Sequence, residues 1–233
     1  MNPRVQRYPD LDAASRALAS ELLRRADGAV AARGRFTVVI SGGRTPLPLY
    51  AHLAREYRSR FPWSRTEVFF ADERCVPSRS PESNFGAAWD SFLSRVPVPR
   101  RQVHRIRGEL RPPSEAATRY ARLVVPVGPP GGPPGPAFDV VLLGIGPDGH
   151  TASLFPGQAA VRERTRSVVA VPRGGLAPFV PRISMTVPAL SSAREVCFLV
   201  SGADKADAVG AIFRSGPRGD PRFPASCVRP PGP

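Results

Sequence analysis

The stretch Phe36–Ile40 reads FTVVI and runs directly into Ser41-Gly42-Gly43. A short run of aromatic and β-branched residues that ends in glycines is typical of a buried strand entering a tight turn. On either side, Asp12–Ala32 and Pro46–Tyr57 carry apolar residues at helical spacing. A buried strand between two such helices indicates an α/β fold.

Buried strands of the same character recur along the chain. The strand candidates are Val68–Ala71, Phe138–Leu143 (FDVVLL), Ser167–Val171, Arg182–Val187 and Glu195–Val200, and a last helix is expected over Asp204–Phe213. Nearly continuous apolar strands separated by helices predict a mainly parallel sheet with helices on both faces. Ligands of such sheets bind at the carboxyl ends of the strands, and several of these strands run into loops that carry Gly, Asp or His.

A single domain over residues 1–233 accounts for the length and for a hydrophobic content of 42%. Val125–Ala137 (VPVGPPGGPPGPA) suits neither a helix nor a central strand, and we interpret it as an exposed connection within the domain. No apolar run is long enough to span a membrane, and the first residues lack the apolar block of a signal peptide. Cys75, Cys197 and Cys227 show no paired spacing, which favours free, partly buried thiols and a cytoplasmic location.

The net charge of +14 would ordinarily suggest a nucleic acid or a membrane surface as the partner. However, Lys205 is the only lysine, and the arginines accompany 29 prolines and 21 glycines, as in proteins of GC-rich genomes. The basic residues are scattered, with no long run and no interleaved aromatic residues. The sequence therefore argues against both of these partners and leaves a few arginines for a small anionic ligand.

The first candidate site is the turn Ser41-Gly42-Gly43-Arg44-Thr45, between a strand and a helix. Glycines let backbone N–H groups approach an anion, and a helix N-terminus adds partial positive charge. Thr45 offers a hydroxyl donor, and Arg44 offers a charge. An ordinary tight turn with a capping hydroxyl is the alternative, and the turn is not a P-loop because no Gly-Lys-Ser/Thr follows.

Further charged and polar side chains follow other predicted strands. Asp72, Glu73 and Arg74 come directly after a strand, with Asn84 further along the chain. The two acids and the arginine could form a structural ion pair, or Arg74 could hold a phosphate with two hydrogen bonds. Arg182 lies in PRISMT, and Lys205 opens the last helix just after a strand. Each of these two could meet a phosphate or could be a solvated surface charge.

His150 is one of only three histidines and the one that lies in a glycine-rich loop. This loop, Gly144–Pro156 (GIGPDGHTASLFP), follows a predicted strand and places Asp148 two residues before the histidine. Imidazole is the side chain best suited to activate water near neutral pH, so His150 is the candidate general base. A structural histidine is the alternative. We expect His52 to be a surface or packing residue and His104 to be exposed.

Five motifs occur in the order expected of the 6-phosphogluconolactonase family: SGGRTP, ADERCVPSRSPESNFG, LLGIGPDGHTASLFPG, PRISMT and SGADKA. The resemblance covers Leu11 to Arg229 and implies a Rossmann-like open sheet, as in the wider group that includes glucosamine-6-phosphate deaminases. The deaminases continue after Gly-Asp-Gly-His with Asn and Glu, whereas this chain continues with Thr-Ala-Ser-Leu-Phe-Pro. This difference favours the lactonase, a carboxylic ester hydrolase, over the deaminase.

The resemblance implies that His150 activates the water that attacks 6-phospho-D-glucono-1,5-lactone and then protonates the ring oxygen. Asp148 would position His150 or the water, and the product would be 6-phospho-D-gluconate of the oxidative pentose phosphate pathway. No cofactor and no metal is implied. The residues assigned to binding of the substrate and its phosphate are Ser41, Gly42, Gly43, Arg44, Thr45, Asp72, Arg74, Asn84, Arg182 and Lys205.

The chain departs from the family pattern in two places. Arg44 stands where many relatives have Ser or Thr, which adds charge beside the phosphate. The sequence ends at CVRPPGP, where relatives usually continue with a short strand that carries Trp and Asp and then a final helix. From this shortened C-terminus we expect an uncovered sheet edge and lower stability, with the chemistry retained.

Three other functions are alternatives to the lactonase. An aldose–ketose isomerase or deaminase is disfavoured by TASLFP. A non-catalytic sugar-phosphate sensor should carry a helix-turn-helix segment, for which there is no room before Leu11. A nucleic-acid-binding protein would require a steep salt dependence of DNA binding. No segment resembles a dedicated association surface, so a monomer is expected.

Overall fold

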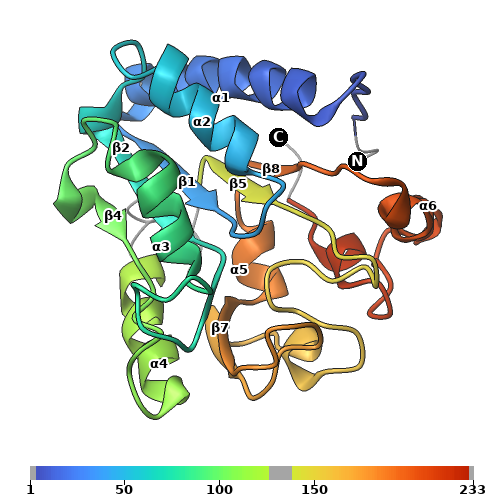
Figure 1. Ribbon diagram of the computed structural model, residues 1–233. Coiled ribbons are helices and arrows are strands. Elements are labelled where there is room, and N and C mark those ends of the chain that lie inside the picture. The colour runs from blue at the N-terminus through green and yellow to red at the C-terminus, as the bar shows by residue number, and fades with distance from the viewer. Residues whose placement is uncertain (1–3, 126–137, 231–233) are drawn as a thin grey trace.

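The computed structural model describes residues 4–125 and 138–230 and has an α/β architecture (Figure 1). Residues 126–137 of the predicted Pro/Gly connection lie outside the described part. In chain order the elements are α1 (Leu11–Arg33), β1 (Phe36–Ile40), α2 (Leu47–Glu56), β2 (Thr66–Phe70), β3 (Asp72–Arg74), α3 (Asn84–Ala88), β4 (Val103–His104), α4 (Pro113–Val124), β5 (Val140–Leu143), β6 (Val168–Val171), β7 (Arg182–Met185), α5 (Val187–Ser191), β8 (Glu195–Phe198) and α6 (Ala206–Arg214).

The central sheet has five parallel strands in the order β4-β2-β1-β5-β8. The chain builds β2 and β4 on one side of β1 and then β5 and β8 on the other, so the strand order reverses between β1 and β5. Such a switch point opens a crevice at the carboxyl ends of the two strands. Here these ends continue into Ser41–Thr45 and Gly144–His150, so the predicted parallel sheet is confirmed and brings the two glycine-rich loops to one edge.

A buried carboxylate fastens β1 to β5 below these loops. Asp139 Oδ2 accepts hydrogen bonds from the backbone N–H of Thr37 (2.8 Å) and from its hydroxyl (2.9 Å), and Arg33 donates to Oδ1 at 2.6 Å. At the other end of the strands, the Ser41 hydroxyl donates to the Leu142 carbonyl at 2.7 Å. The two loops therefore start from strand ends whose relative position is fixed by side chains as well as by the sheet.

A second sheet is antiparallel and has three strands in the order β3-β7-β6. The strands expected over Ser167–Val171 and Arg182–Val187 belong here rather than to the parallel sheet. The second of them ends at Met185, because α5 begins at Val187 with Pro188 in its first turn. Apolar runs alone do not distinguish a parallel partner from an antiparallel one, so the sequence could not separate the two sheets.

Helices lie on both sides of the central sheet. In Figure 1, α1 and α2 run side by side above the sheet, α5 lies below it, and α6 stands apart on the right. Strand β1 is buried over its whole length, from Phe36 to Ile40, as its apolar run predicted. No helix in the described ranges is both long and apolar enough to cross a membrane.

The structure corrects the expectation for His104 and specifies the role of His52. His104 is only 23% exposed, because β4 sets its ring 4.4 Å from that of Phe69 and its Nε2 2.5 Å from Glu67. The prediction of an exposed residue is therefore wrong. His52 is a packing residue whose Nδ1 lies 2.7 Å from Glu56. The free, at least partly buried state expected of the three cysteines is confirmed.

Candidate active site

His150 lies in a tight loop that leaves the carboxyl end of β5. Gly146 N donates to the His150 carbonyl at 2.8 Å, and Gly149 N donates to the Gly146 carbonyl at 3.0 Å. Gly149 has a φ of +80°, which favours glycine over any residue with a side chain. The Thr151 hydroxyl donates to the Gly144 carbonyl at 2.9 Å and ties the end of the loop to its beginning. The backbone of the loop is thus closed on itself around the histidine.

His150 and Asp148 form a hydrogen-bonded pair inside this loop. His150 Nδ1 lies 2.6 Å from Asp148 Oδ1, and the His150 backbone N–H donates to the same oxygen at 3.1 Å. Burial raises the pKa of the Asp148 carboxyl, but the hydrogen bond and charge of His150 outweigh burial and leave the pKa below its ordinary value. Ionised Asp148 can only accept, so Nδ1 carries the proton and Nε2 remains free to accept one.

Gly146 leaves no room for a side chain beside this pair. A Cβ atom on Gly146 would lie 1.9 Å from His150 Nδ1 and 2.7 Å from Asp148 Oδ1. Both distances are far shorter than any van der Waals contact, so the imidazole occupies the space that a side chain would need. Glycine at this position is therefore part of what seats the candidate base.

A second cluster joins the loop after β1 to the loop after β5. Asp72 is buried; its Oδ2 accepts from the Ser153 hydroxyl at 2.6 Å, and its carbonyl accepts from Asn84 Nδ2 at 2.9 Å. A Cβ on Gly42 would lie 1.8 Å from Asn84 Oδ1, so the glycine turn rests directly on the amide. Ala152 turns the chain from the histidine to Ser153 with a φ of +48°, uncommon for alanine. The structure thus brings together Gly42, Asp72 and Asn84, three of the predicted site residues.

Arg74 and Arg182 lie opposite each other on β3 and β7, where they are register partners. Like charges in such positions repel, yet neither arginine forms an ion pair with a carboxylate in the described ranges. The Nε atoms of both are buried and lack a hydrogen-bond partner. Desolvation lowers the pKa of Arg182, and Arg74 adds to this lowering while Asp72 opposes it. Two adjacent, incompletely neutralised guanidinium groups favour a bound anion.

A single phenyl ring separates this arginine pair from the candidate base. The Arg182 Cζ atom lies 5.7 Å from the Phe155 ring centre, and the Phe155 ring centre lies 4.7 Å from that of His150. Arg182 Nη2 donates to the carbonyls of Leu176 (3.1 Å) and Pro178 (2.8 Å), which hold the guanidinium against the ring. The cation and the imidazole therefore contact the same side chain.

The glycine turn has an exposed backbone and a fixed first residue. Ser41 is held by its own bond to β5 and by Tyr50, whose hydroxyl donates to the Ser41 carbonyl at 2.6 Å. Gly43 and Arg44 are exposed, and Gly43 has a φ of +91°. No side-chain cap is present at the start of α2, so the alternative in which Thr45 caps the helix is wrong. The turn offers accessible backbone N–H groups beside the second cluster.

Lys205 stands apart from these clusters in its contacts. It precedes α6, and its Nζ lies 2.8 Å from Asp204 Oδ2. The hydrogen bond with Lys205 lowers the pKa of the Asp204 carboxyl. Lys205 also lines a cavity of about 850 Å³ together with Ser201 and Gly202. The structure therefore gives this predicted residue a carboxylate partner rather than a place beside Arg74 and Arg182.

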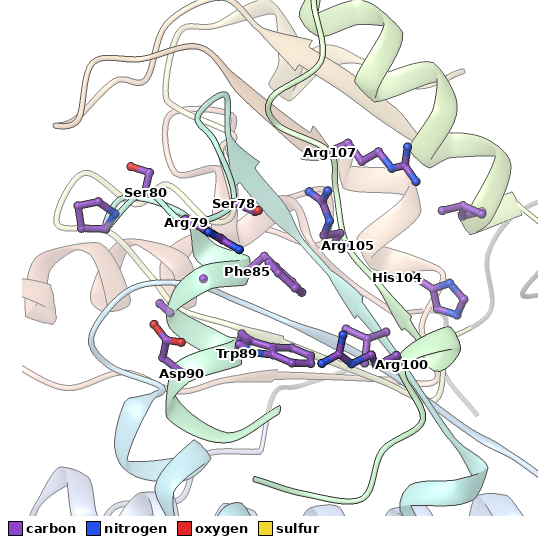
Figure 2. A pocket seen from close by; sticks show the side chains of 15 residues that line it. Ser78, Arg79, Ser80, Phe85, Trp89, Asp90, Arg100, His104, Arg105 and Arg107 are labelled. Atoms are coloured by element: carbon purple, nitrogen blue, oxygen red, sulfur yellow. The ribbon is translucent and has the colours of Figure 1, made fainter. Parts of the chain in front are cut away.

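A further cavity, of about 900 Å³, lies on the opposite side of α3 (Figure 2). Asn84 faces the glycine turn, whereas Phe85 and Trp89 face this cavity. Figure 2 shows Arg100 against Trp89, with its Cζ 5.1 Å from the ring centre, and Arg105 beside Phe85 at 5.5 Å. None of the predicted site residues lines this cavity. This cavity therefore lies apart from the predicted site.

Residues 9–232 match the family described as glucosamine-6-phosphate isomerases/6-phosphogluconolactonase. The chain belongs to this family. A family member from Synechocystis sp., named 6-phosphogluconolactonase, is 38% identical over 88% of this chain and 82% of its own length. A member of the same name from Streptomyces coelicolor is 38% identical over 97% of this chain and 88% of its own. The resemblance drawn from the motifs is thereby confirmed.

Solved structures of similar proteins agree with the fold. The 6-phosphogluconolactonase of Thermotoga maritima superposes with a TM-score of 0.80 at 31% identity, covering 93% of this chain and 90% of that one. A monomeric glucosamine-6-phosphate deaminase superposes equally well, at 0.80, but is only 19% identical. Fold similarity therefore does not distinguish the lactonase from the deaminase.

Three residues of the site were not predicted from the sequence. Ser153 and Phe155 lie in the TASLFP stretch, which distinguishes the lactonase from the deaminase but does not by itself indicate a role for either residue. The sequence signal that could have indicated them is their position, since both follow His150 within five residues. Phe223, whose ring would meet a Cβ on Gly149 at 2.8 Å, lies in a segment without regular periodicity. Nothing in the sequence indicated that this segment reaches the histidine loop.

Proposed function

We propose that this chain is a 6-phosphogluconolactonase that hydrolyses 6-phospho-D-glucono-1,5-lactone to 6-phospho-D-gluconate in the oxidative pentose phosphate pathway. The observation that carries the proposal is the pair Arg74 and Arg182, register partners with buried, unpartnered Nε atoms beside the ring that contacts His150. A buried cation without a counter-ion is unfavourable, and a phosphate on the substrate would supply one. The names of the relatives give the same substrate class.

In the proposed reaction, His150 Nε2 takes a proton from a water molecule as the water oxygen attacks the lactone carbonyl. The tetrahedral intermediate then collapses, and the bond between the carbonyl carbon and the ring oxygen breaks. The imidazolium returns the proton to the ring oxygen, which leaves as a hydroxyl group, so the net change is the addition of one water. Asp148 holds the imidazole in the tautomer that makes this possible.

The phosphate would be held by Arg74, Arg182 and the backbone N–H groups of the glycine turn, with Lys205 as a further cation. Binding at this remote group fixes the ring for attack, which offsets part of the entropy lost on orientation. For Lys205 to take part, it must exchange Asp204 for the phosphate. We assign Asp72 and Asn84 to the support of the turn, because both are buried. Asn84 contacts the turn at Gly42, and Asp72 is hydrogen-bonded to Asn84.

The same proposal treats residues 1–233 as one domain that works as a cytoplasmic monomer without a cofactor. One hydrophobic core extends from α1 to Val228, which supports a single folding unit. Among the described residues, no group of three His, Cys, Asp or Glu side chains is arranged to hold a metal ion.

The test is hydrolysis of freshly generated 6-phosphogluconolactone by the intact protein, with the spontaneous opening of the lactone subtracted at each time point. We expect enzyme-dependent acid release that saturates with lactone and is competed by 6-phosphogluconate. A parallel reaction with glucosamine 6-phosphate measures ammonia. Ammonia release without lactone hydrolysis would show that the protein is a deaminase. If neither activity is found, the remaining function is that of a sugar-phosphate sensor.

Replacing Gly146 by alanine is expected to lower lactone hydrolysis on the order of 10²-fold, because the new Cβ displaces the imidazole and misplacement by about 1 Å has an effect of this size. The matched control is Gly144→Ala in the same loop, since a Cβ at Gly144 meets nothing within 4 Å. Steady-state rates of both variants are compared at equal folded fraction. Similar rates in the two variants would show that the position of the His150 ring does not limit the reaction.

A further inference from the structure

The segment Gly219–Arg229, here called the C-terminal brace, lies directly on the histidine loop. The Ala225 backbone N–H donates to the Gly149 carbonyl at 3.0 Å. A Cβ on Gly149 would lie 2.8 Å from Phe223 Cδ1 and 3.1 Å from Phe223 Cα, so the brace covers the very space that a side chain on Gly149 would take. The peptide that precedes His150 is therefore held both by a hydrogen bond and by an aromatic ring.

The brace is held together by hydrogen bonds within itself. Asp220 and Phe223 form a bridge in which Phe223 N donates to the Asp220 carbonyl at 2.8 Å. The Ser226 hydroxyl accepts from Asp220 N at 2.7 Å and donates to the Asp220 carbonyl at 3.1 Å. Ser226 and Ala225 are 2% and 1% exposed. A short segment with this density of internal bonds can serve as a fixed surface for the loop to rest on.

Arg229 anchors the brace to two helices. Its backbone N–H donates to the hydroxyl of Ser191, the last residue of α5, at 3.0 Å. Its Nε donates to the Ser226 carbonyl at 2.9 Å, and its Nη2 to the carbonyl of Ser215, directly after α6, at 3.3 Å. Through Arg229, the segment that contacts Gly149 is thus attached to the helices α5 and α6.

We propose that Phe223 is a positioning residue for the reaction: through Gly149, the C-terminal brace sets the place of the His150 imidazole against Asp148. The loop has its own two backbone bonds, but Gly149 is its most permissive residue, with a φ of +80°. A ring packed on this glycine removes the freedom that glycine would otherwise give the neighbouring histidine. This inference rests on the proposed role of His150 as the general base.

The kinetic test is a double-mutant cycle between Phe223→Ala and His150→Ala, with Leu123→Ala on the exposed face of α4 as the control for loss of an apolar side chain. We expect Phe223→Ala to lower kcat about 10-fold to 10²-fold with KM changed less than about 2-fold, and to cause no further loss in the His150→Ala background. Phe223→Leu should recover most of the rate. An equal loss in both backgrounds would assign Phe223 to general stability and overturn the proposal.

A second readout does not require that the proposed function is right. The chain has three histidines, so the imidazole ¹H–¹⁵N spectrum of the full chain is assigned by comparison with His150→Ala. Phe223→Ala, or Phe223→Val where the alanine variant fails to fold, should shift or broaden the His150 signals and leave those of His52 and His104 in place, whereas Phe223→Leu should largely restore the His150 signals. Unchanged His150 signals would overturn the positioning role even for a protein without lactonase activity, whereas shifted signals without activity would contradict only the proposed function.

Discussion

Replacing His150 by alanine is expected to lower the enzymatic rate of lactone hydrolysis by about 10²–10⁴-fold, the usual contribution of a general base. The Asp148 carboxylate accepts a hydrogen bond from His150 Nδ1 at 2.6 Å. The other ring nitrogen, Nε2, is therefore free to accept a proton from water. KM should change little, since the imidazole does not belong to the proposed phosphate site. The measurement is steady-state hydrolysis with the spontaneous reaction subtracted.

The matched control for this variant is His104→Ala. That histidine is also partly buried and also pairs with a carboxylate, Glu67, but it lies on β4, away from both glycine-rich loops. We expect its rate to stay within a few-fold of the intact protein. A rate for His150→Ala equal to that of the control would show that the protein is an enzyme in which His150 is not the general base. Substrate binding by the arginine pair would then have to account for the whole acceleration.

Much of the fold could be predicted because its information is local. The composition of FTVVI and FDVVLL predicts buried parallel strands, and the glycines that follow them indicate the carboxyl edge of the sheet, where ligands bind. The pairing of β3 with β7 could not be predicted in this way. β3 consists of Asp72-Glu73-Arg74, three polar residues that resemble a loop, and its partner lies more than 100 residues further along the chain.

The site shows the same division. Asp148 and His150 are neighbours in sequence, so their pairing follows from the loop itself. The contact of Arg74 with Arg182, and that of Phe223 with Gly149, depend on where distant segments meet. The predicted alternative of an ion pair among Asp72, Glu73 and Arg74 fails for a further reason. Glu73 turns away from the arginine head group and accepts backbone N–H groups instead, which no pattern of charges along the chain can show.

Replacing Glu73 by alanine is accordingly expected to destabilise the protein by about 3–5 kcal/mol, although the residue takes no part in the chemistry. Its carboxylate is 2% exposed and accepts four hydrogen bonds: from the backbone N–H groups of Arg74 (2.7 Å), Asn84 (2.7 Å) and Phe85 (2.8 Å), and from the Ser83 hydroxyl (2.9 Å). Burial raises the pKa of this carboxyl while these donors oppose the rise. Alanine would leave all four donors buried without an acceptor.

The destabilisation is measured as the shift of the urea unfolding midpoint at unchanged slope, against Glu115→Ala on the surface of α4. Glu115 pairs with Arg119, one helical turn away, and its loss should change the free energy of unfolding by about 0.5 kcal/mol or less. Glu73→Gln should fall between the two, because it keeps one of the two accepting oxygens. A loss below about 1 kcal/mol for Glu73→Ala would mean that water satisfies the donors. The start of α3, and with it the seat of the glycine turn on Asn84, would then be held by backbone and packing alone.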